Sequence, residues 1–422
     1  MTRFRWVLAI LVITVVGILA PSLVGARVFL GTDLLEAFSP WSTEAPDDVV
    51  VTNPLVGDTV DSLQRVLLSD RLRAGDMAPL WDGHVHGGQP VASVPTHALY
   101  SPFNIGVWVL PAWYAPITAK ALELFAAIGF MYLFLRRLGL ARFSAALAGF
   151  VFAFSGFQVV WTNWSQAHVG ALIPGLFWAI EYTLAKRRAA SIVPLAVIVA
   201  VMWLEGFPSV TVYALVFAGV YTVVRCCTHS ELRPALVSAG TALAAVLAGT
   251  ALAAFQLIPF AFFVRGIDAA TRIQEPNWHL ARRTLATLAV PNAFGSPADV
   301  YFGPADYLIY GPVNYVEIQA FIGIAALGLI AVAAVYGRRV VGTPLIAYLW
   351  VSIASIAFVM YAASPLLDLV HSLPLIGTNH IGRLRSVFLF LLAVLVGIGA
   401  EALIRRLPSR SNRAQRAGLA AA

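Results

Sequence analysis

The residues Gly31-Thr32-Asp33-Leu34-Leu35-Glu36 begin a polar stretch that separates an apolar N-terminal segment from the apolar remainder of the chain. The stretch ends near Pro102 and contains ten of the 21 carboxylates in the 422 residues, all between Asp33 and Asp82. Almost everything that follows is apolar. Because the ionisable side chains gather in one long loop between apolar segments, we expect the functional site to lie there.

The composition excludes a soluble globular domain. Hydrophobic residues make up 59% of the chain and charged residues 12%, whereas soluble domains contain about 25% charged residues. Apolar segments of about 20 residues recur, and as helices these are long enough to cross a hydrocarbon core of about 30 Å. The sequence therefore predicts an all-α polytopic membrane protein.

We expect about ten membrane spans. Short basic clusters follow alternate spans, for example Arg136 and Arg137 or Arg405 and Arg406, whereas the short loops on the other side carry no Lys or Arg. The positive-inside rule then places both termini in the cytoplasm and the first loop outside it. The expected spans are 6–29, 117–135, 143–161, 169–184, 192–204, 208–224, 235–264, 318–336, 343–362 and 386–404.

Several function classes do not fit this sequence. The net charge of +7 comes from clusters at span ends and not from a basic stripe, so we expect no binding of nucleic acid. The sequence contains no P-loop, dinucleotide fingerprint, nucleophile elbow or cysteine-pair metal motif. ATP-driven transport by this chain alone is therefore not expected.

The first loop carries three candidate residues. Asp33 follows the first span directly, where a carboxylate is either simply solvated or acts as a general base on a substrate whose carrier lies in lipid. Asp58 fits the N-cap of a helix, and with Asp33 it could instead hold a divalent cation such as Mg²⁺ or Mn²⁺. His86 lies in a glycine-rich turn with His84, and a zinc site there would need ligands that the sequence does not identify.

Residues 58–73 have helical periodicity and predict a helix lying on the outer membrane surface. Its apolar face is expected to contain Val60, Leu63, Val66 and Leu67.

Polar residues at the outer ends of later spans complete the candidate set, because such groups are costly near the membrane. Arg383 has the chemistry to bind a phosphate, although interfacial anchoring explains it equally. Besides Asp58 and His86, the expected substrate contacts are His168, Glu205, Gln256, Glu317 and Arg383.

A succession of short motifs resembles the YfhO family of bacterial polytopic membrane proteins. The resemblance covers nearly the whole chain, and the order of the motifs makes it specific. They are Gly31-Thr32-Asp33-Leu34-Leu35, Asp58-Thr59-Val60-Asp61, Pro79-Leu80-Trp81-Asp82, Leu135-Arg136-Arg137-Leu138-Gly139, Gly206-Phe207-Pro208, Gln256-Leu257-Ile258-Pro259, Pro291-Asn292-Ala293-Phe294-Gly295 and the approach to the last span at 379–385.

That family resembles the membrane glycosyltransferases with the GT-C fold. The resemblance implies a bacterial plasma (inner) membrane protein, a polyprenyl-phosphate sugar as donor, and an acidic catalytic base in the first outer loop, which Asp33 matches. This chain departs from the family pattern at Trp81-Asp82-Gly83, where Trp-Asn-Pro is usual, and at Phe207, where His is usual. It also ends soon after Arg406, as a short relative or a fragment would.

These observations predict one GT-C-like transmembrane domain over residues 1–406, with extracytoplasmic loops at 31–102 and 265–316, and a cytoplasmic basic tail at 407–422. The predicted activity is sugar transfer from a polyprenyl-phosphate donor to a cell-envelope polymer or lipid, with Asp33 as general base. Arg383, with a metal held by Asp58, would stabilise the departing phosphate. A transporter or flippase of a lipid-linked glycan, and a non-catalytic assembly factor, remain as alternatives.

Overall fold

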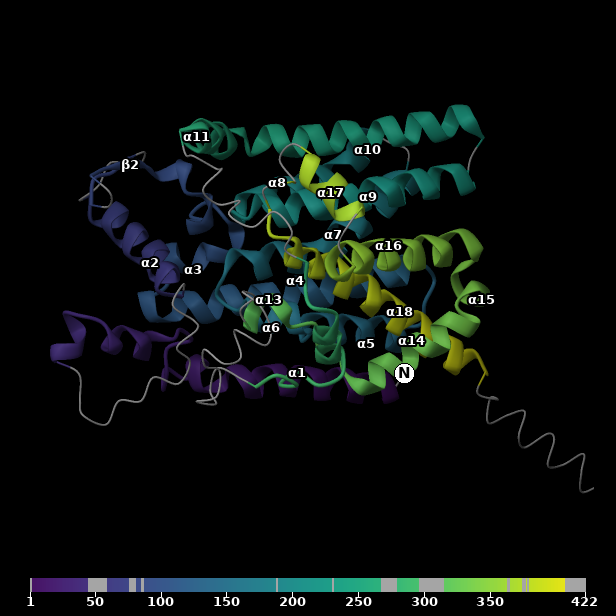
Figure 1. Cartoon of the computed structure of the whole chain (residues 1–422), viewed down its shortest axis with the longest axis horizontal. Coiled ribbons are helices and arrows are strands. Elements are labelled where there is room, and N and C mark those ends of the chain that lie inside the picture. The colour runs from purple at the N-terminus through teal and green to yellow at the C-terminus, as the bar shows by residue number, and fades with distance from the viewer. Residues whose placement is uncertain are drawn as a thin grey trace, which may run out of the picture.

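The computed structural model describes residues 2–44, 59–75, 81–84, 87–186, 189–229, 231–266, 279–295, 315–362, 365–373, 377 and 379–406. The expected tail at 407–422 lies outside this part of the chain, as does most of the expected loop at 265–316. The described residues form a bundle of apolar helices (Figure 1). The helices are α1 (Thr2–Leu23), α2 (Thr59–Ala74), α3 (Ile105–Val109), α4 (Ala115–Arg137), α5 (Arg142–Ala153), α6 (Gly156–Val160), α7 (Ser165–Lys186), α8 (Val193–Leu204), α9 (Pro208–His229), α10 (Leu232–Leu252), α11 (Ala254–Arg265), α13 (Tyr315–Ile318), α14 (Ile324–Tyr336), α15 (Arg338–Val341), α16 (Thr343–Tyr361), α17 (Leu366–Ser372) and α18 (Arg385–Arg406).

The prediction of an all-α polytopic membrane protein is confirmed. Within the described residues, five helical segments are long and apolar enough to cross a membrane, and they contain α4, α9, α10, α16 and α18. Shorter apolar helices accompany them, among them α5, α8, α11 and α14. A single pair of two-residue strands, β1 (Trp81–Asp82) and β2 (Gln89–Pro90), is present in the described part of the first loop.

The bundle has two distinct ends (Figure 1). The first loop, with α2 and β2, lies at one end, which we call the loop end. The N-terminus and the last turn of α18 lie together at the opposite end, which we call the basic end. There Arg225 donates to Glu181 (Nη2–Oε2 2.9 Å), and the guanidinium of Arg137 lies 5.4 Å from the ring centre of Tyr182. The start of α1 and the end of α18 therefore lie at the same end of the described bundle.

Two expected spans are interrupted. The segment 143–161 divides into α5 and α6, because the N–H of Gly156 donates outside the helix, to the carbonyl of Phe321 (2.7 Å). The two backbones lie so close there that a Cβ on Gly156 would lie 2.6 Å from the Phe321 nitrogen. The segment 235–264 divides at Ala253, and α11 runs across the end of α10 (Figure 1). There the ring of Phe255 lies 5.1 Å from that of Tyr100 in the first loop. Contacts between segments therefore override the continuous apolar pattern.

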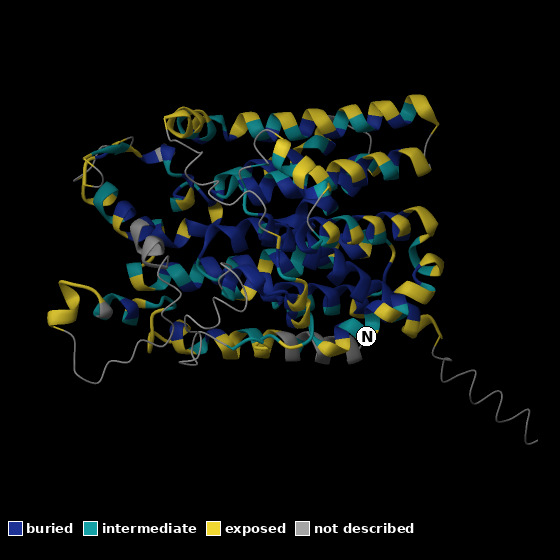
Figure 2. Cartoon of the chain, in the orientation of Figure 1, coloured by how far each residue is buried: buried dark blue, intermediate teal, exposed yellow. Residues whose placement is uncertain are grey.

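Helix α18 fills the centre of the bundle, where Figure 2 shows the buried core. Every residue from Arg385 to Ala402 is buried, as expected for a helix that is apolar on all sides. The ring of Phe390 lies 4.7 to 6.0 Å from those of Phe134, Phe152 and Phe177. A Cβ on Gly399 would lie 1.9 Å from the Leu329 carbonyl oxygen, so glycine permits the close approach of α14, as small residues do between membrane helices.

Helix α2 has the expected position in the sequence, and its described buried residues match the expected apolar face only in part. Leu67, expected on the apolar contact face, is 43% exposed, whereas Arg65 is buried. Val66 packs with Val107 and Ala115 of the segment that leads into α4. Helix α2 therefore packs on the loop end of the bundle through Val66, and its expected position on the outer membrane surface stays a prediction.

Candidate functional site

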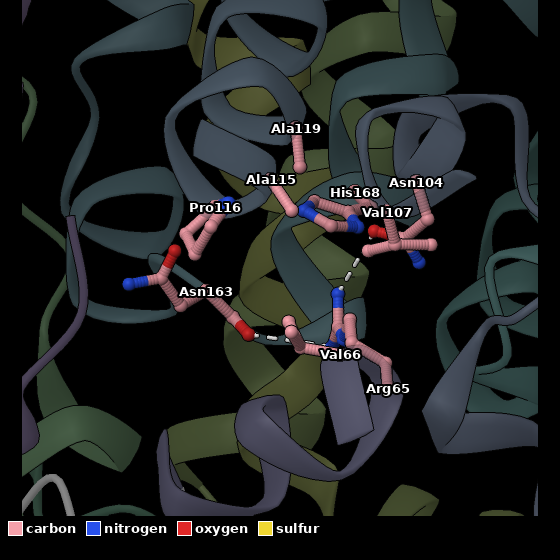
Figure 3. Close-up of a pocket in the computed structure, with 9 residues that line it drawn as sticks. All are labelled: Arg65, Val66, Asn104, Val107, Ala115, Pro116, Ala119, Asn163 and His168. Atoms are coloured by element: carbon pink, nitrogen blue, oxygen red, sulfur yellow. Dashed lines mark hydrogen bonds between the residues drawn. The ribbon is translucent and has the colours of Figure 1, made fainter. Parts of the chain in front are cut away.

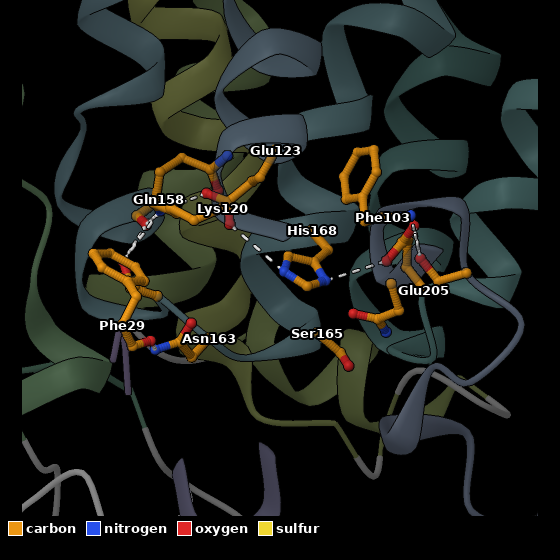
Figure 4. Close-up of polar contacts among 12 residues, drawn as sticks. Phe29, Phe103, Lys120, Glu123, Gln158, Asn163, Ser165, His168 and Glu205 are labelled. Carbon is orange, nitrogen blue, oxygen red and sulfur yellow. Dashed lines mark hydrogen bonds and ion pairs between the residues drawn. The ribbon is translucent and has the colours of Figure 1, made fainter. Parts of the chain in front are cut away.

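Four buried ionisable side chains form a row at the loop end, which we call the charged row: Lys120, Glu123, His168 and Glu205 (Figure 4). The Lys120 ammonium lies 2.6 Å from Glu123 Oε1. The other oxygen of Glu123 lies 3.7 Å from His168 Nε2, and His168 Nδ1 lies 3.2 Å from Glu205 Oε2. None of the four residues is more than 7% exposed.

The row combines one ammonium group, two carboxyl groups and one imidazole, whose two ring nitrogens face the two carboxyl groups. Buried charges are tolerated when they are paired and hydrogen-bonded. Lys120 meets this condition, since its ammonium also donates to the Gln158 carbonyl (3.2 Å) and to the Thr162 hydroxyl (3.1 Å).

Three helices bring the row together. Lys120 and Glu123 are three residues apart on α4 and so share a face, whereas His168 lies in the first turn of α7 and Glu205 directly follows α8. The ring of Phe103 packs edge-on against His168 at 5.5 Å. The row therefore depends on the packing of α4, α7 and α8 and on the first loop.

The first loop is fixed to the row at two neighbouring positions. The Ser101 hydroxyl donates to Glu205 Oε1. Gly206 has φ +82°, and a Cβ there would lie 1.7 Å from the carbonyl oxygen of Pro95. A side chain at this position would separate the loop from the bundle, so the contact requires glycine.

A small pocket lies beside His168 (Figure 3). Arg65 crosses it and donates to Asn104 Oδ1 (3.2 Å) and to the Asn163 carbonyl (3.5 Å). Its free volume of about 10 Å³ gives room for about one water molecule. The lining residues are Arg65, Val66, Asn104, Val107, Ala115, Pro116, Ala119, Asn163 and His168.

The structure connects the segment before Asp33 to this pocket. Asn163 Nδ2 donates to the carbonyl of Phe29 (2.9 Å), four residues before Asp33. Asp33 itself is half-buried in the 3₁₀ helix η1 (Thr32–Ala37). Its predicted role as a base is not tested by this placement. Asp58 and His86 lie outside the described residues.

A second group of charges surrounds Glu317, and we call it the arginine cluster. The Glu317 carboxylate lies 3.6 Å from Arg383, 3.7 Å from Arg385 and 3.6 Å from His380. Arg385 is fully buried and also donates to the carbonyls of Val316 (2.8 Å), Gln319 and Gly382 (2.8 Å). Arg385 is therefore structural, whereas the Arg383 side chain is 24% exposed.

The expected contact residues thus divide into three groups. His168 and Glu205 belong to the charged row, and Glu317 and Arg383 to the arginine cluster. Gln256 is buried and donates to the carbonyl of Trp203 (3.4 Å), a contact that fixes the start of α11. No described contact brings Gln256 to either group.

Sequence reasoning missed three residues of the site. Lys120 had a signal, since a cation three residues before Glu123 within an apolar run predicts a buried pair. Arg65 is not one of the residues expected on the apolar face of its helix, and Ser101 has no distinguishing pattern. Their roles follow from tertiary contacts with Asn104 and Glu205.

The described residues contain no group of three His, Cys, Asp or Glu side chains arranged to hold a metal ion. Asp33 and Asp58, the expected metal ligands, cannot be assessed as a pair because Asp58 is not among those residues. No metal is therefore assigned to the site.

No protein-family model matches this chain, and no curated protein matches it. Among solved structures, the chain is similar to the arabinofuranosyltransferase AftD from mycobacteria, determined by single-particle cryo-EM, with 17% sequence identity and a TM-score of 0.46. The match covers 83% of this chain and 24% of that chain, so this chain spans about a quarter of the length of its neighbour. The resemblance to the YfhO family stays a prediction from sequence.

Proposed function

We propose that this protein is a membrane glycosyltransferase, which moves a sugar from a polyprenyl-phosphate donor to a cell-envelope acceptor at the loop end of the bundle. The motif succession suggests the reaction class. The observation that carries the proposal is the charged row, in which four buried ionisable side chains meet under the first loop. Ionisable groups are costly within a membrane protein and mark functional sites by default.

In the proposed reaction, Asp33 removes the proton from an acceptor hydroxyl. The oxygen then attacks the anomeric carbon while the bond from that carbon to the phosphate oxygen breaks, through an oxocarbenium-like transition state. The leaving group departs as a lipid phosphate, whose charge Arg383 stabilises. The Phe29–Asn163 hydrogen bond supports this arrangement, because it fixes the chain just before Asp33 to the pocket wall.

The charged row has a positioning role in this proposal. Glu205 and the adjacent Gly206 hold the first loop against the bundle through Ser101 and Pro95. Catalytic groups must be held within a fraction of an ångström of their productive geometry. In this proposal these contacts hold the part of the loop at Pro95–Ser101, and the Asn163–Phe29 hydrogen bond holds the part just before Asp33.

The test is complementation of a strain that lacks the gene, read as the glycan composition of the cell envelope. We expect one sugar to disappear on deletion, to return with the wild type, and to stay absent with Asp33→Asn at equal expression. Asp70→Asn is the matched control, since Asp70 is a partly exposed carboxylate of the same loop that pairs with Arg73. Restoration by Asp33→Asn would falsify the role of Asp33.

A second assay separates a transferase from a transporter. Purified protein in detergent does not separate two membrane leaflets, so it cannot move a lipid from one to the other. A transferase still forms labelled product from a short-chain polyprenyl-phosphate sugar and an acceptor extract, whereas a flippase or an assembly factor forms none. Absence of product with active wild-type protein in cells would favour those alternatives.

A further inference from the structure

Three buried side chains near the arginine cluster make no hydrogen bond to any residue that the structure describes. They are Trp161 through Nε1, Ser209 through Oγ and Tyr213 through its hydroxyl, and their residues are 3%, 5% and 2% exposed. Buried polar groups in folded proteins nearly always have a partner, and exceptions call for an explanation. Three such groups mark positions where an acceptor from outside the described chain, such as water or a ligand, can bind.

Arg383 lies beside one of these side chains. Its guanidinium carbon lies 5.8 Å from the ring centre of Trp161 and 4.7 Å from that of Phe207. Ser209 and Tyr213 are one helical turn apart at the start of α9, and Ser209 follows Phe207 by two residues. The Arg383 side chain is 24% exposed, so this side chain is accessible from the surface.

The chemistry of these groups selects an acceptor. The indole N–H of Trp161 can only donate a hydrogen bond, and so can Nε of Arg383, which is also buried without a partner. The hydroxyls of Ser209 and Tyr213 can donate as well. A ligand with several acceptor oxygens satisfies all four, as a phosphate does.

The arginine cluster also carries excess positive charge. Glu317 supplies one negative charge to the two guanidinium groups of Arg383 and Arg385. Burial lowers the pKa of His380 below its usual value, and the nearby Arg383 and Arg385 add to this effect against Glu317. The formal charges of Glu317, Arg383 and Arg385 sum to +1, which an anion would balance.

We propose that Arg383, Trp161, Ser209 and Tyr213 form a phosphate-binding site at the loop end, which takes the phosphate of a lipid. The identity of the ligand as a lipid phosphate rests on the proposed function, whereas the anion site rests on the contacts above. Arg383 supplies the charge, and the Trp161 N–H and the two hydroxyls supply neutral donors. The Phe207 and Trp161 rings flank the guanidinium and restrict its orientation.

The test measures binding by the full chain in lipid nanodiscs, with decyl phosphate as the probe and decyl maltoside as the neutral control for partitioning into lipid. We expect saturable binding of decyl phosphate that weakens about tenfold in Tyr213→Phe and in Trp161→Phe, since each removes one donor and keeps the ring. We expect Arg383→Gln to weaken it by about a hundredfold. Inorganic phosphate is the second probe.

Tyr348→Phe is the matched control. Tyr348 is a buried tyrosine whose hydroxyl already donates to the Phe217 carbonyl (2.9 Å). We expect Tyr348→Phe to bind decyl phosphate as the wild type does but to melt at a lower temperature. Tyr213→Phe should show the opposite result, weaker binding with an equal or higher melting temperature, because it removes a buried hydroxyl that has no partner.

The outcomes separate this inference from the proposed function. Unchanged binding in Tyr213→Phe, Trp161→Phe and Arg383→Gln, with all three folded, overturns the site even if the wild type transfers sugar. Binding that depends on these residues without any sugar transfer supports the site and not the enzyme. Inorganic phosphate bound as tightly as decyl phosphate, with the same dependence on these residues, supports the anion site and overturns the lipid as its source.

Discussion

Glu205 accepts a hydrogen bond from Ser101, which lies 104 residues earlier in the chain. Glu205 also faces His168, so one carboxylate joins the first loop to the charged row. The first loop and the charged row are therefore structurally coupled, and a substitution in one should alter the packing of the other.

The Ser101–Glu205 contact gives the first prediction. Ser101→Ala leaves a fully buried carboxylate without this donor, and we expect it to destabilise the docked loop by about 1–3 kcal/mol. Limited trypsin digestion is the measurement, because Arg71 and Arg73 of α2 become targets when the loop leaves the bundle. Ser372→Ala, at an exposed hydroxyl, serves as control. Equal digestion rates for the two variants would contradict the prediction.

Gly206 gives the second prediction. Gly206→Ala adds a Cβ 1.7 Å from the Pro95 carbonyl oxygen. The alanine must also adopt the left-handed backbone conformation of Gly206, which alone costs about 1–3 kcal/mol of stability. We expect a clear loss of thermal stability and rapid digestion of the first loop. Gly129→Ala on α4 is the control, since nothing lies within 4 Å of its Cβ and alanine favours helix by about 0.5–1 kcal/mol. Equal melting temperatures for the two variants would contradict the prediction that the close approach of Gly206 to Pro95 requires glycine.

The Lys120–Glu123 pair gives the third prediction. Either Lys120→Met or Glu123→Gln leaves a buried charge without its partner, which costs about 3–5 kcal/mol. The double variant removes both charges and should recover much of that loss, as a thermal melting series of the four proteins would measure. An additive loss in the double variant would mean that the two residues act independently.

His97 gives a prediction for pH. Burial, with a smaller contribution from Arg65 and against the effect of Asp82, lowers the pKa of His97 from 6.5 to about 4. Below about pH 6.5 the unfolded chain therefore takes up a proton on His97 while the folded chain does not. The contribution of His97 to stability is fully present above that pH and is lost between pH 6.5 and 4. The full effect is about 3 kcal/mol.

The measurement compares melting temperatures at pH 7.5, 6 and 5 for the wild type and His97→Asn. The wild type should lose more stability than the variant as the pH falls. Parallel curves would show that His97 does not control the pH dependence of the first loop.

Most of the helices could be predicted from the sequence, and the site only in part. Apolar runs locate the helices because the membrane requires about 20 residues per span. The breaks at Gly156 and Ala253 could not be predicted, since each depends on a segment distant in sequence, Phe321 in one case and Tyr100 in the other. His168 and Glu205 were expected as candidates, but their alignment with Lys120 and Glu123 requires the packing of three helices. The exposed position of Leu67 and the buried position of Arg65 show the same limit, because the helical period fixes which residues share a face and the tertiary contacts fix which face is buried.

The buried position of α18 has a consequence for biosynthesis. All other described helices precede α18 in the chain, so the ribosome releases the walls of the bundle before its central helix. Until residues 385–402 enter the membrane, Phe134, Phe152 and Phe177 lack the Phe390 ring on which they pack. The arrival of α18 thus fills the interior of the described bundle, and a nascent chain stalled before it presents an unfilled interior to the quality-control machinery of the cell.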